Sequence, residues 1–310
     1  MQSLKVLVTG ASGFLGRHVA GGLTAKGHDV KGFDIVQSDV AAGEFVQGDF
    51  TSKAELLPAL KGMDGVCHIG GIGDVYLAEQ DPELAFRVNG FGTQVVCDCC
   101  ASAGIRTLLY ASTWEVYGQP RYQPIDEQHP CNPETPYSIS KLAGELIVRN
   151  RQLSGDTRQI ALRLGTAYGT FMRKTAVVPR FIARASAGEP LVVQGEGSQF
   201  RQFTHARDIA EAFAAGLQYS GKSRVFNIVS NNHVTIKELA RIVSEQYHVP
   251  IEFAPLRGGD PPSAVISSRL ASEELRWEAK EEFSRALNEL LAYYQLDRDF
   301  DRRTGRDAEL

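Results

Sequence analysis

The sequence predicts an α/β fold, a doubly wound parallel sheet with a smaller C-terminal region. Three observations carry this prediction. The first half alternates short β-branched runs with longer helical patterns, which is typical of βαβ units. A glycine-rich turn joins the first predicted strand to the first predicted helix. After about residue 165 the pattern loosens into proline- and glycine-punctuated segments, and an apolar content of 43% in 310 residues suffices for a large core and an appendage.

The element pattern divides the chain near residue 165. Residues 1–165 are expected to form the sheet domain, and residues 166–310 a smaller substrate-binding region interleaved with the last sheet strands. Strands are predicted at Leu4–Thr9, Asp29–Asp34, Glu44–Gln47, Gly65–His68, Thr107–Ala111 and Gln159–Leu164. Helices are predicted at about Gly13–Lys26, Lys53–Leu60, Pro82–Ala103, Ser138–Leu153, Arg207–Gln218, Thr235–Tyr247 and Phe283–Tyr294, with a loop at 254–262.

Composition and charge exclude several classes of partner. A net charge of −4, with acids and bases interspersed, offers no basic surface for nucleic acid. The sequence has no signal-peptide pattern and no apolar run of about 18 residues, so we expect no membrane partner and a cytoplasmic protein. The five cysteines lack a second ligand pair at metal-binding spacing, and Cys97 and Cys100 suit an apolar helix face, so no metal is expected.

The first turn carries a pattern for binding phosphates. The segment VLVTGASGFLGRHVA sets Gly10, Gly13 and Gly16 between a predicted strand and a predicted helix. Each glycine meets a steric need: a tight turn, the approach of backbone to a pyrophosphate, and close packing of helix on strand. The helix N-terminus adds unpaired N–H groups and a partial positive charge. The turn therefore predicts a dinucleotide site.

Two aspartates after later strands refine that prediction. Asp34 is expected at the end of the second strand, where its carboxylate can accept hydrogen bonds from both hydroxyls of an adenosine ribose. A 2′-phosphate would meet like charge there, so Asp34 favours NAD over NADP. Asp49, in the segment QGDF, is placed to accept the adenine amine. A turn role remains the alternative for both aspartates.

A tyrosine and a lysine form the candidate catalytic pair. In PYSISKLAGE, Tyr137 and Lys141 stand four residues apart at the start of a predicted helix, so both side chains project from one face. An ammonium close to the phenol should lower the pKa of Tyr137 from about 10 toward neutrality, which makes it a candidate base for a sugar hydroxyl. Such spacing is common by chance, but the upstream segment YASTWEVYG makes chance a poor explanation.

Together these segments resemble the extended short-chain dehydrogenase/reductase family, in its NAD-dependent epimerase/dehydratase branch. The resemblance runs from about Leu4 to the final predicted helix and includes VTGASGFLG, HIGG, VNGFGT, ASTWEVYG, PYSISK, LRLGTAYG, GEGSQFRQFTHARDIA and RGGD. It implies a Rossmann fold, NAD as cofactor, a nucleotide-sugar substrate, and a homodimer paired through the helices predicted at 82–103 and 138–153. The spacing of the motifs is specific for the branch but not for one substrate.

The resemblance also implies roles residue by residue. Tyr137 falls on the base, Lys141 on its partner, and Thr113 on the hydroxyl that orients the reacting group. Cofactor contacts are implied at Gly10, Gly13, Phe14, Leu15, Gly16, Asp34, Asp49, Phe50, Ile69, Gly70, Gly71, Asn89, Ser112, Tyr137 and Lys141. Substrate contacts are implied at Thr113, Thr166, Val193, Arg201, Arg257 and Asp260, and guanidinium groups match a diphosphate well.

Two departures from the family pattern bear on the substrate and the reaction. Thr166 stands where many relatives have an asparagine that contacts the diphosphate, so the substrate is either held differently or is not a standard nucleotide sugar. Thr113-Trp114-Glu115 stands where the 4,6-dehydratases have Thr-Asp-Glu or Thr-Ser-Glu. Glu115 is available as a second acid or base, whereas Trp114 cannot donate a proton as aspartate would. A structural ion pair is the alternative for Glu115.

The leading interpretation is an NAD-dependent nucleotide-sugar epimerase, acting by Tyr/Lys-assisted hydride transfer at a sugar carbinol, expected at C4. The alternatives are a nucleotide-sugar 4,6-dehydratase or decarboxylase that uses Glu115, and a one-way sugar or uronate dehydrogenase or ketoreductase. A non-catalytic Rossmann protein that senses NAD is an alternative of another class. The intact set of Thr113, Tyr137 and Lys141 argues against a sensor, which needs no poised phenol.

Overall fold

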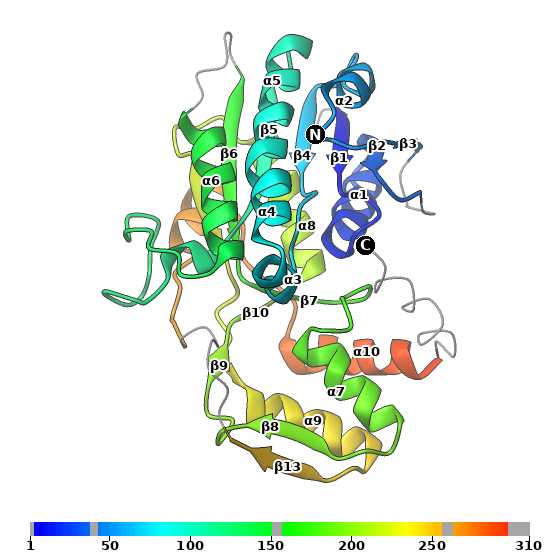
Figure 1. Ribbon diagram of the computed structural model, residues 1–310, viewed down its shortest axis with the longest axis vertical. Helices are drawn as coiled ribbons and strands as arrows, with labels where there is room; N and C mark the ends of the chain where they lie inside the picture. The colour runs from blue at the N-terminus through cyan, green and yellow to red at the C-terminus, as the bar shows by residue number, and fades with distance from the viewer. Residues whose placement is uncertain (1–2, 38–42, 151–156, 256–262, 297–310) are drawn as a thin grey trace.

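The computed structural model describes residues 3–37, 43–150, 157–255 and 263–296 (Figure 1). Its main strands are β1 (Lys5–Thr9), β2 (Asp29–Asp34), β3 (Glu44–Gln47), β4 (Gly65–His68), β5 (Thr107–Thr113), β6 (Arg158–Leu164) and β11 (Val225–Ile228). They form one sheet in the order β11-β6-β5-β4-β1-β2-β3, and every neighbouring pair is parallel. The predicted doubly wound sheet is therefore confirmed.

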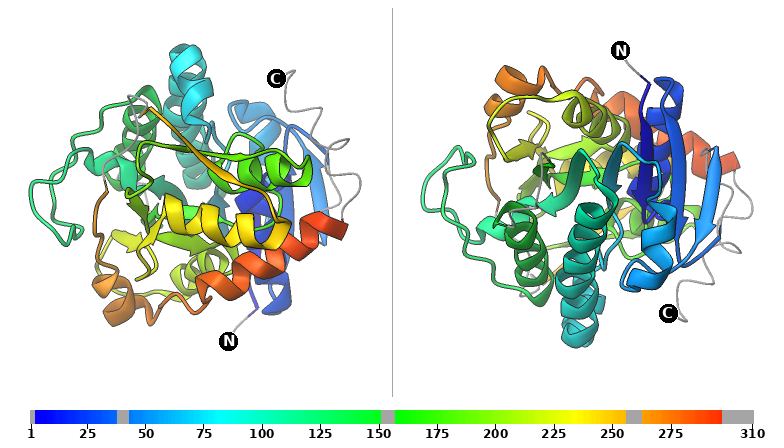
Figure 2. Two further views of the ribbon diagram at one scale, coloured as in Figure 1. Left: turned by 90° about the horizontal axis from the view of Figure 1, so that it is seen from below. Right: turned by 90° about the horizontal axis from the view of Figure 1, so that it is seen from above.

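Helices cover both faces of the sheet (Figure 2). They are α1 (Phe14–Ala25), α2 (Lys53–Ala59), α5 (Thr93–Ala103), α6 (Pro136–Asn150) and α8 (Ala206–Gln218). On one face α1 packs against α8, with Leu23 and Phe213 in a shared buried core. On the other face α5 packs against both α2 and α6, with Leu56, Cys100 and Val148 in a second core. Burial on both faces explains why the strands read as continuous apolar runs.

The segment predicted as one helix from Pro82 to Ala103 is divided into three helical pieces, which corrects that prediction. They are α4 (Pro82–Ala85), the π-helix η1 (Phe86–Gly92) and α5, preceded by α3 (Val75–Gln80). Within η1, Asn89 is buried, and a Cβ on Gly92 would lie 2.6 Å from the ring of Phe50. A single wider turn inside a longer helix leaves the apolar periodicity almost unchanged, so the sequence pattern does not reveal it.

The second half of the chain builds a smaller layer beside the sheet. It contains α7 (Val177–Ser186), β8 (Leu191–Gln194), α9 (Ile236–Tyr247), β13 (Ile251–Ala254) and α10 (Phe283–Leu296). Its core includes Phe181, Leu239 and Leu287, one from each helix. The sequence pattern does not predict α7, because the helix contains Pro179. This proline lies in the first turn, where a backbone N–H has no partner within the helix, so the helix tolerates it.

Short elements connect this layer to the sheet. They are η2 (Trp114–Tyr117), β7 (Thr166–Tyr168), β9 (Phe200–Arg201), β10 (Phe203–His205), β12 (Val234–Thr235) and η3 (Ala271–Leu275). β7 pairs with β10, and β9 pairs with β12. Between β10 and β12 the chain returns to the main sheet as β11. Within the described residues, no helix combines the length and the apolar character needed to cross a membrane.

A buried ion pair fixes α6 against the sheet. Glu145 of α6 is fully buried and accepts hydrogen bonds from Arg163 of β6, at 3.0 Å from Nε and 2.6 Å from Nη2. Ser112 of β5 donates to the same carboxylate at 2.6 Å. The Arg163 guanidinium also lies over the ring of Tyr117, 4.7 Å from its centroid. Two adjacent strands thus bind one charge on α6, which sets the position of this helix.

We expect Arg163→Met to lower the free energy of unfolding by about 3–5 kcal/mol, because it leaves a buried carboxylate without its main cation. The exposed Arg149, whose Nη1 is 3.1 Å from Glu145, compensates only weakly. Urea unfolding followed by circular dichroism measures the loss. Arg180→Met, on the exposed side of α7, is the matched control and should change stability by no more than about 0.5 kcal/mol. Equal urea midpoints for the two variants would contradict this prediction.

Candidate active site

The glycine-rich turn lies at the point where the strand order reverses, with β2 on one side of β1 and β4 on the other. Gly10 has a φ of +68°, and a Cβ there would lie 2.6 Å from Gly70 Cα, so only glycine allows this contact between two turns. A Cβ on Gly16 would lie 1.9 Å from the Gly10 carbonyl oxygen. Gly13 begins α1 without a side-chain cap, so the first backbone N–H groups remain available to phosphates.

The two predicted aspartates lie beside this turn. Asp34 ends β2, and its carboxylate accepts hydrogen bonds from the N–H groups of Ser12 at 3.0 Å and Val36 at 3.2 Å. Asp49 follows β3 and accepts from the N–H of Thr51 at 2.8 Å. The turn interaction that is the alternative role for both aspartates is therefore present at each of them. The carboxylate of Asp34 lies against the backbone of the phosphate-binding turn, at the carboxyl end of its strand.

The other predicted cofactor residues lie along the same sheet edge. Phe14 and Leu15 are the first residues of α1. Phe50 is buried, and a Cβ on Gly70 would meet its ring at 2.7 Å. Ile69 and Gly71 flank Gly70 in the turn after β4, and a Cβ on Gly71 would lie 2.6 Å from Asn89 Oδ1 and 3.8 Å from Lys141 Nζ. The structure therefore brings the cofactor turn into contact with the Tyr/Lys helix.

Asn89 joins that turn to α6. Its Nδ2 donates to the Ile72 carbonyl at 3.1 Å and to Ser140 Oγ at 2.9 Å, and its Oδ1 accepts from the Ile72 N–H at 2.8 Å. Ser140 in turn donates to the carbonyl of Tyr137 at 2.8 Å. Ser112, predicted as a cofactor contact, is buried and donates to Glu145.

Thr113, Tyr137 and Lys141 come together at the junction of β5 and α6. The Thr113 hydroxyl forms a hydrogen bond with the Tyr137 phenol. Burial, followed by the negative charge of Glu115, raises the pKa of Tyr137 above its usual range. The Lys141 ammonium lies over the ring of Tyr110, 4.4 Å from its centroid, and burial lowers the pKa of Lys141 to about 7.

These directions correct the expectation that Lys141 lowers the pKa of Tyr137. Desolvation acts on both groups and disfavours the phenolate as well as the ammonium. In this state the phenol holds its proton at neutral pH, and Lys141 titrates near neutrality. Sequence spacing predicts that the two residues are close, but it contains no information on how much water the fold removes from them.

Glu115 lies in η2, directly after Thr113, and its N–H donates to Thr113 Oγ1 at 3.2 Å. Burial raises the pKa of its carboxyl to about 7, while the charges of Arg173 and Arg201 act in the opposite direction. Among the described residues, Glu115 is in no ion pair within 4.0 Å. A carboxyl that titrates near neutrality can both give and take a proton, so Glu115 has the properties of a general acid or base.

Arg173 is a residue that the sequence analysis does not single out. Its Nη1 donates to the Gly73 carbonyl at 2.5 Å, and its Nε lies 3.4 Å from Asp74 Oδ2. Its positive charge lowers the pKa of both Glu115 and Tyr137. The only sequence signal is its place shortly after TAYG, in a loop at the same sheet edge. The contact with the turn after β4 arises only in the fold.

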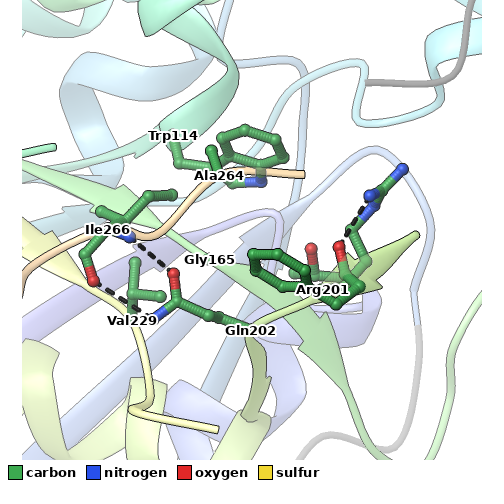
Figure 3. A pocket seen from close by; sticks show the side chains of 9 residues that line it. Trp114, Gly165, Arg201, Gln202, Val229, Ala264 and Ile266 are labelled. Carbon is green, nitrogen blue, oxygen red and sulfur yellow. Dashed lines mark hydrogen bonds between the residues drawn. The ribbon is translucent and has the colours of Figure 1, made fainter. Parts of the chain in front are cut away.

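A small pocket lies beside Trp114 (Figure 3). Gln202 holds its wall: the side-chain amide donates to the carbonyls of Ser230 at 2.8 Å and Ile266 at 3.1 Å, and its oxygen accepts from the Ile266 N–H at 2.7 Å. Thr166 and Arg201, both predicted substrate residues, meet here. The residues lining the pocket are Trp114, Gly165, Thr166, Phe200, Arg201, Gln202, Val229, Ala264 and Ile266.

Of the three remaining predicted substrate residues, Val193 is not among the residues that line this pocket. Val193 is fully buried in β8, in the core of the smaller layer. Arg257 and Asp260 lie outside the described residues.

Comparison with known proteins agrees with this geometry. The model of the NAD dependent epimerase/dehydratase family matches residues 6–229. The chain belongs to this family. A UDP-glucose 4-epimerase of Azospirillum brasilense is 30% identical over 306 residues, covering 90% of this chain and 88% of that protein. A dTDP-D-glucose 4,6-dehydratase of Mus musculus is 29% identical over 259 residues, covering 76% of this chain and 71% of that protein.

The fold of a solved relative matches over nearly the whole chain. The structure of MoeE5 in complex with UDP-glucuronic acid and NAD has a TM-score of 0.86 at 27% identity and covers 94% of this chain and 99% of its own. Membership of the family makes this protein an NAD-dependent enzyme. Its residues fit the cofactor. Gly10 and Gly70 carry no side chain where their two turns meet, and the N-terminus of α1 has no side-chain cap, so backbone N–H groups can face the phosphates of a dinucleotide.

We expect NAD to bind at least about tenfold more tightly than NADP, equivalent to about 1.4 kcal/mol, because Asp34 would face the added 2′-phosphate with like charge. Calorimetry of both cofactors measures the ratio. Asp34→Ser should bring the two affinities closer, whereas Asp29→Ser, at the exposed start of the same strand, should preserve the preference. Equal affinities in the unaltered protein would disprove the role of Asp34.

Proposed function

We propose that this enzyme is a nucleotide-sugar epimerase that acts at a sugar carbinol, at C4. The observation that carries the proposal is the meeting of Thr113, Tyr137 and Lys141 with the cofactor turn, through Asn89, at the carboxyl end of the sheet. The nucleotide part of the substrate lies toward the pocket with Arg201 and Thr166. This placement is supported by the match of guanidinium geometry to a diphosphate.

In the proposed mechanism, Thr113 and Tyr137 bind the reacting hydroxyl, and Tyr137 takes its proton as a phenolate. To become a phenolate, Tyr137 first gives up the proton that burial makes it retain at neutral pH. Lys141, with its pKa near 7, lies one turn along the same helix face and can accept that proton. When bound, NAD supplies the acceptor for the hydride of the carbinol C–H bond and the donor that returns it to the opposite face of the keto sugar, which inverts the configuration. Thr113 and Tyr137 position the sugar, the pocket residues hold the nucleotide part, and this positioning contributes much of the rate enhancement.

A second candidate is a 4,6-dehydratase or a decarboxylase that uses Glu115. The raised pKa of this carboxyl favours it, because a group that titrates near 7 can remove and return a carbon-bound proton. Trp114 weighs against the dehydratase, since this buried indole stands at the sequence position of the dehydratases' aspartate and cannot protonate a leaving hydroxyl as a carboxyl group would. The two candidates share the Tyr137 step and differ in the need for Glu115.

We also propose a homodimer in the cytoplasm. Large apolar side chains are exposed on η1 and α6: Phe86 by 40%, Phe91 by 59%, Ile139 by 40% and Leu146 by 43%. Such a patch on neighbouring helices is typical of a helix-pairing interface. A reducing compartment is supported by the cysteines, since all five lie in the described part of the chain and are present as thiols.

We expect Tyr137→Phe to lower kcat by about 10²–10⁴, with folding and NAD affinity nearly unchanged, because the substitution removes the acidic oxygen and keeps the ring. Turnover of UDP-sugars followed by chromatography is the measurement. Tyr122→Phe, on an exposed loop, is the matched control and should retain full activity. Full activity of Tyr137→Phe would refute the mechanism in all its forms.

Glu115→Gln separates the two candidates. In an epimerase we expect a modest change in rate and no accumulated product, because no proton on carbon needs to be moved. In a dehydratase or decarboxylase the second step should stop, leaving a 4-keto sugar and the absorbance of NADH. Mass spectrometry of the released sugars together with the absorbance spectrum decides. A trapped keto sugar would replace epimerisation with elimination as the proposed reaction.

We expect static light scattering at micromolar protein to give the mass of two chains. A charge at Phe91 or Leu146 should produce single chains, because burying an unpaired carboxylate in an apolar interface is costly. Phe91→Glu tests this, with Phe253→Glu, exposed by 56% on β13, as the control that should stay dimeric. The mass of a single chain for the unaltered protein would exclude the dimer.

A further inference from the structure

His68 is a buried histidine to which the proposed reaction assigns no task. It ends β4 and is 1% exposed. Its ring centroid lies 5.0 Å from that of Phe50 and 5.6 Å from that of Tyr110. The cofactor turn follows His68 directly in the sequence, and the Lys141 ammonium lies against the ring of Tyr110. The ring therefore occupies the space between the cofactor turn and the helix that carries the acid–base pair.

On one side of the ring, Thr93 of α5 determines where the imidazole proton lies. The Thr93 hydroxyl donates its single proton to the Asn89 carbonyl at 2.7 Å. Toward His68 Nε2, which is 3.1 Å away, the same oxygen can therefore act only as an acceptor. Nε2 must carry a proton to complete this bond.

On the other side, Thr9 of β1 completes the assignment. Its hydroxyl oxygen accepts hydrogen bonds from the N–H groups of Ile69 and Gly70, each at 3.2 Å. Its proton is then directed to His68 Nδ1, which lies 2.7 Å away. Nδ1 is an acceptor, so His68 is a neutral imidazole with its proton on Nε2.

The surroundings keep His68 in this form. Burial, reinforced by the positive charge of Lys141 on α6, lowers the pKa of His68 to about 3. The other titratable groups in this region are the phenol of Tyr110 on β5, which donates to the Lys141 carbonyl at 3.2 Å, and the phenol of Tyr137 on α6. None of these places an anion against the imidazole, since burial raises the pKa of both phenols.

We propose that His68 is a positioning residue that couples the cofactor turn to the acid–base helix. Through Thr9 it orients the turn at Ile69–Gly70. Through Thr93 it orients Asn89, whose side chain holds Ile72 and Ser140. The inference rests on the proposed roles of Tyr137 and Lys141 for its effect on turnover, but its effect on NAD binding does not depend on them.

The coupling arises because the hydroxyls of Thr9 and Thr93 each have a single proton. The direction of one hydrogen bond therefore fixes the direction of the next. A side chain at position 68 must accept from Thr9 and donate to Thr93 at the same time. An apolar side chain leaves the Thr9 proton without its acceptor and removes the N–H that Thr93 Oγ1 accepts from. The Thr9 hydroxyl then rotates toward another acceptor and loosens the turn, and Thr93 loses the bond that fixes its position beside Asn89. Glutamine carries an acceptor and a donor on one planar group and can restore both bonds.

The experiment compares His68→Leu and His68→Gln with His28→Leu and His28→Gln. His28 is also buried but lies at the opposite sheet edge, where its Nδ1 accepts from the N–H of Leu4 at 3.2 Å. NAD affinity is measured by calorimetry without sugar, followed by kcat and thermal stability. We expect His68→Leu to bind NAD at least about tenfold more weakly and His68→Gln to recover to within about threefold. The His28 variants should bind NAD as the unaltered protein does.

Two outcomes would overturn the proposal. One is unchanged NAD affinity in His68→Leu; the other is a loss in His68→Leu that His68→Gln repeats in full, which would indicate a packing role alone. Because these readings use no sugar, they stand even if Tyr137→Phe retains activity and the proposed reaction fails.

Nitrogen NMR of the unaltered protein tests the hydrogen-bond network directly, and a variant is needed only to assign the signal. With ¹⁵N-labelled histidine, the His68 ring should show the neutral form protonated on Nε2, unchanged between about pH 5 and pH 9. The spectrum of His68→Gln assigns the signal. A ring protonated on Nδ1, or one that titrates in this interval, would contradict the network.

Discussion

The carboxylate of Glu145 is the charge on which the active-site architecture depends. It is buried between a helix and two strands, where an uncompensated charge is strongly unfavourable. Arg163 from β6 and Ser112 from β5 both reach it, so α6 can occupy only one rotation about its axis. Lys141 lies one turn earlier on that helix, and the charge of Glu145 raises the pKa of its ammonium against the effect of burial. The structural ion pair thus also shapes the chemistry.

Desolvation is the second physical theme of the site. It lowers the pKa of Lys141 and raises the pKa values of Tyr137 and Glu115. The pKa values of Lys141 and Glu115 thus move toward 7, whereas that of Tyr137 moves away from it. The smaller layer built by the second half of the chain lies beyond the carboxyl end of the sheet (Figure 1). Arg173 contributes by bonding to the turn at Gly73, and it brings a positive charge near both acids. The same arginine therefore both links two loops at the site and changes the pKa values of its acidic groups.

The buried polar groups between β1, β4, η1 and α6 form a directed chain of hydrogen bonds. Each hydroxyl along it has one donor proton, and this makes the direction of every bond dependent on its neighbours. The π-helical turn of η1 is where Asn89 enters the chain, with its backbone carbonyl bonded to Thr93 and its side chain to Ser140. Such chains favour one conformation over close alternatives, since a displaced member leaves a buried group unsatisfied.

The sequence by itself determined the features that depend on neighbouring residues. The strand, turn and helix around Gly10 and Gly16 follow from local sterics, and Asp34 follows from its place at a strand end. The helical spacing of Tyr137 and Lys141 likewise predicts that they share a face. Family motifs extended this to Thr113, which contacts Tyr137, and to Asn89, which contacts Ser140 on the same helix.

Only the tertiary structure decided the features that depend on distant groups. Arg173 reaches the site across about a hundred residues of sequence, which no local pattern records. β11 takes the edge of the main sheet through pairing with β6, and α7 forms despite Pro179 because its apolar side chains have a core to enter. The direction of the Tyr137 pKa shift was wrong in the sequence analysis for the same reason. Spacing shows which charges are near, but the fold alone determines how much water leaves them, and desolvation outweighs a single neighbouring charge.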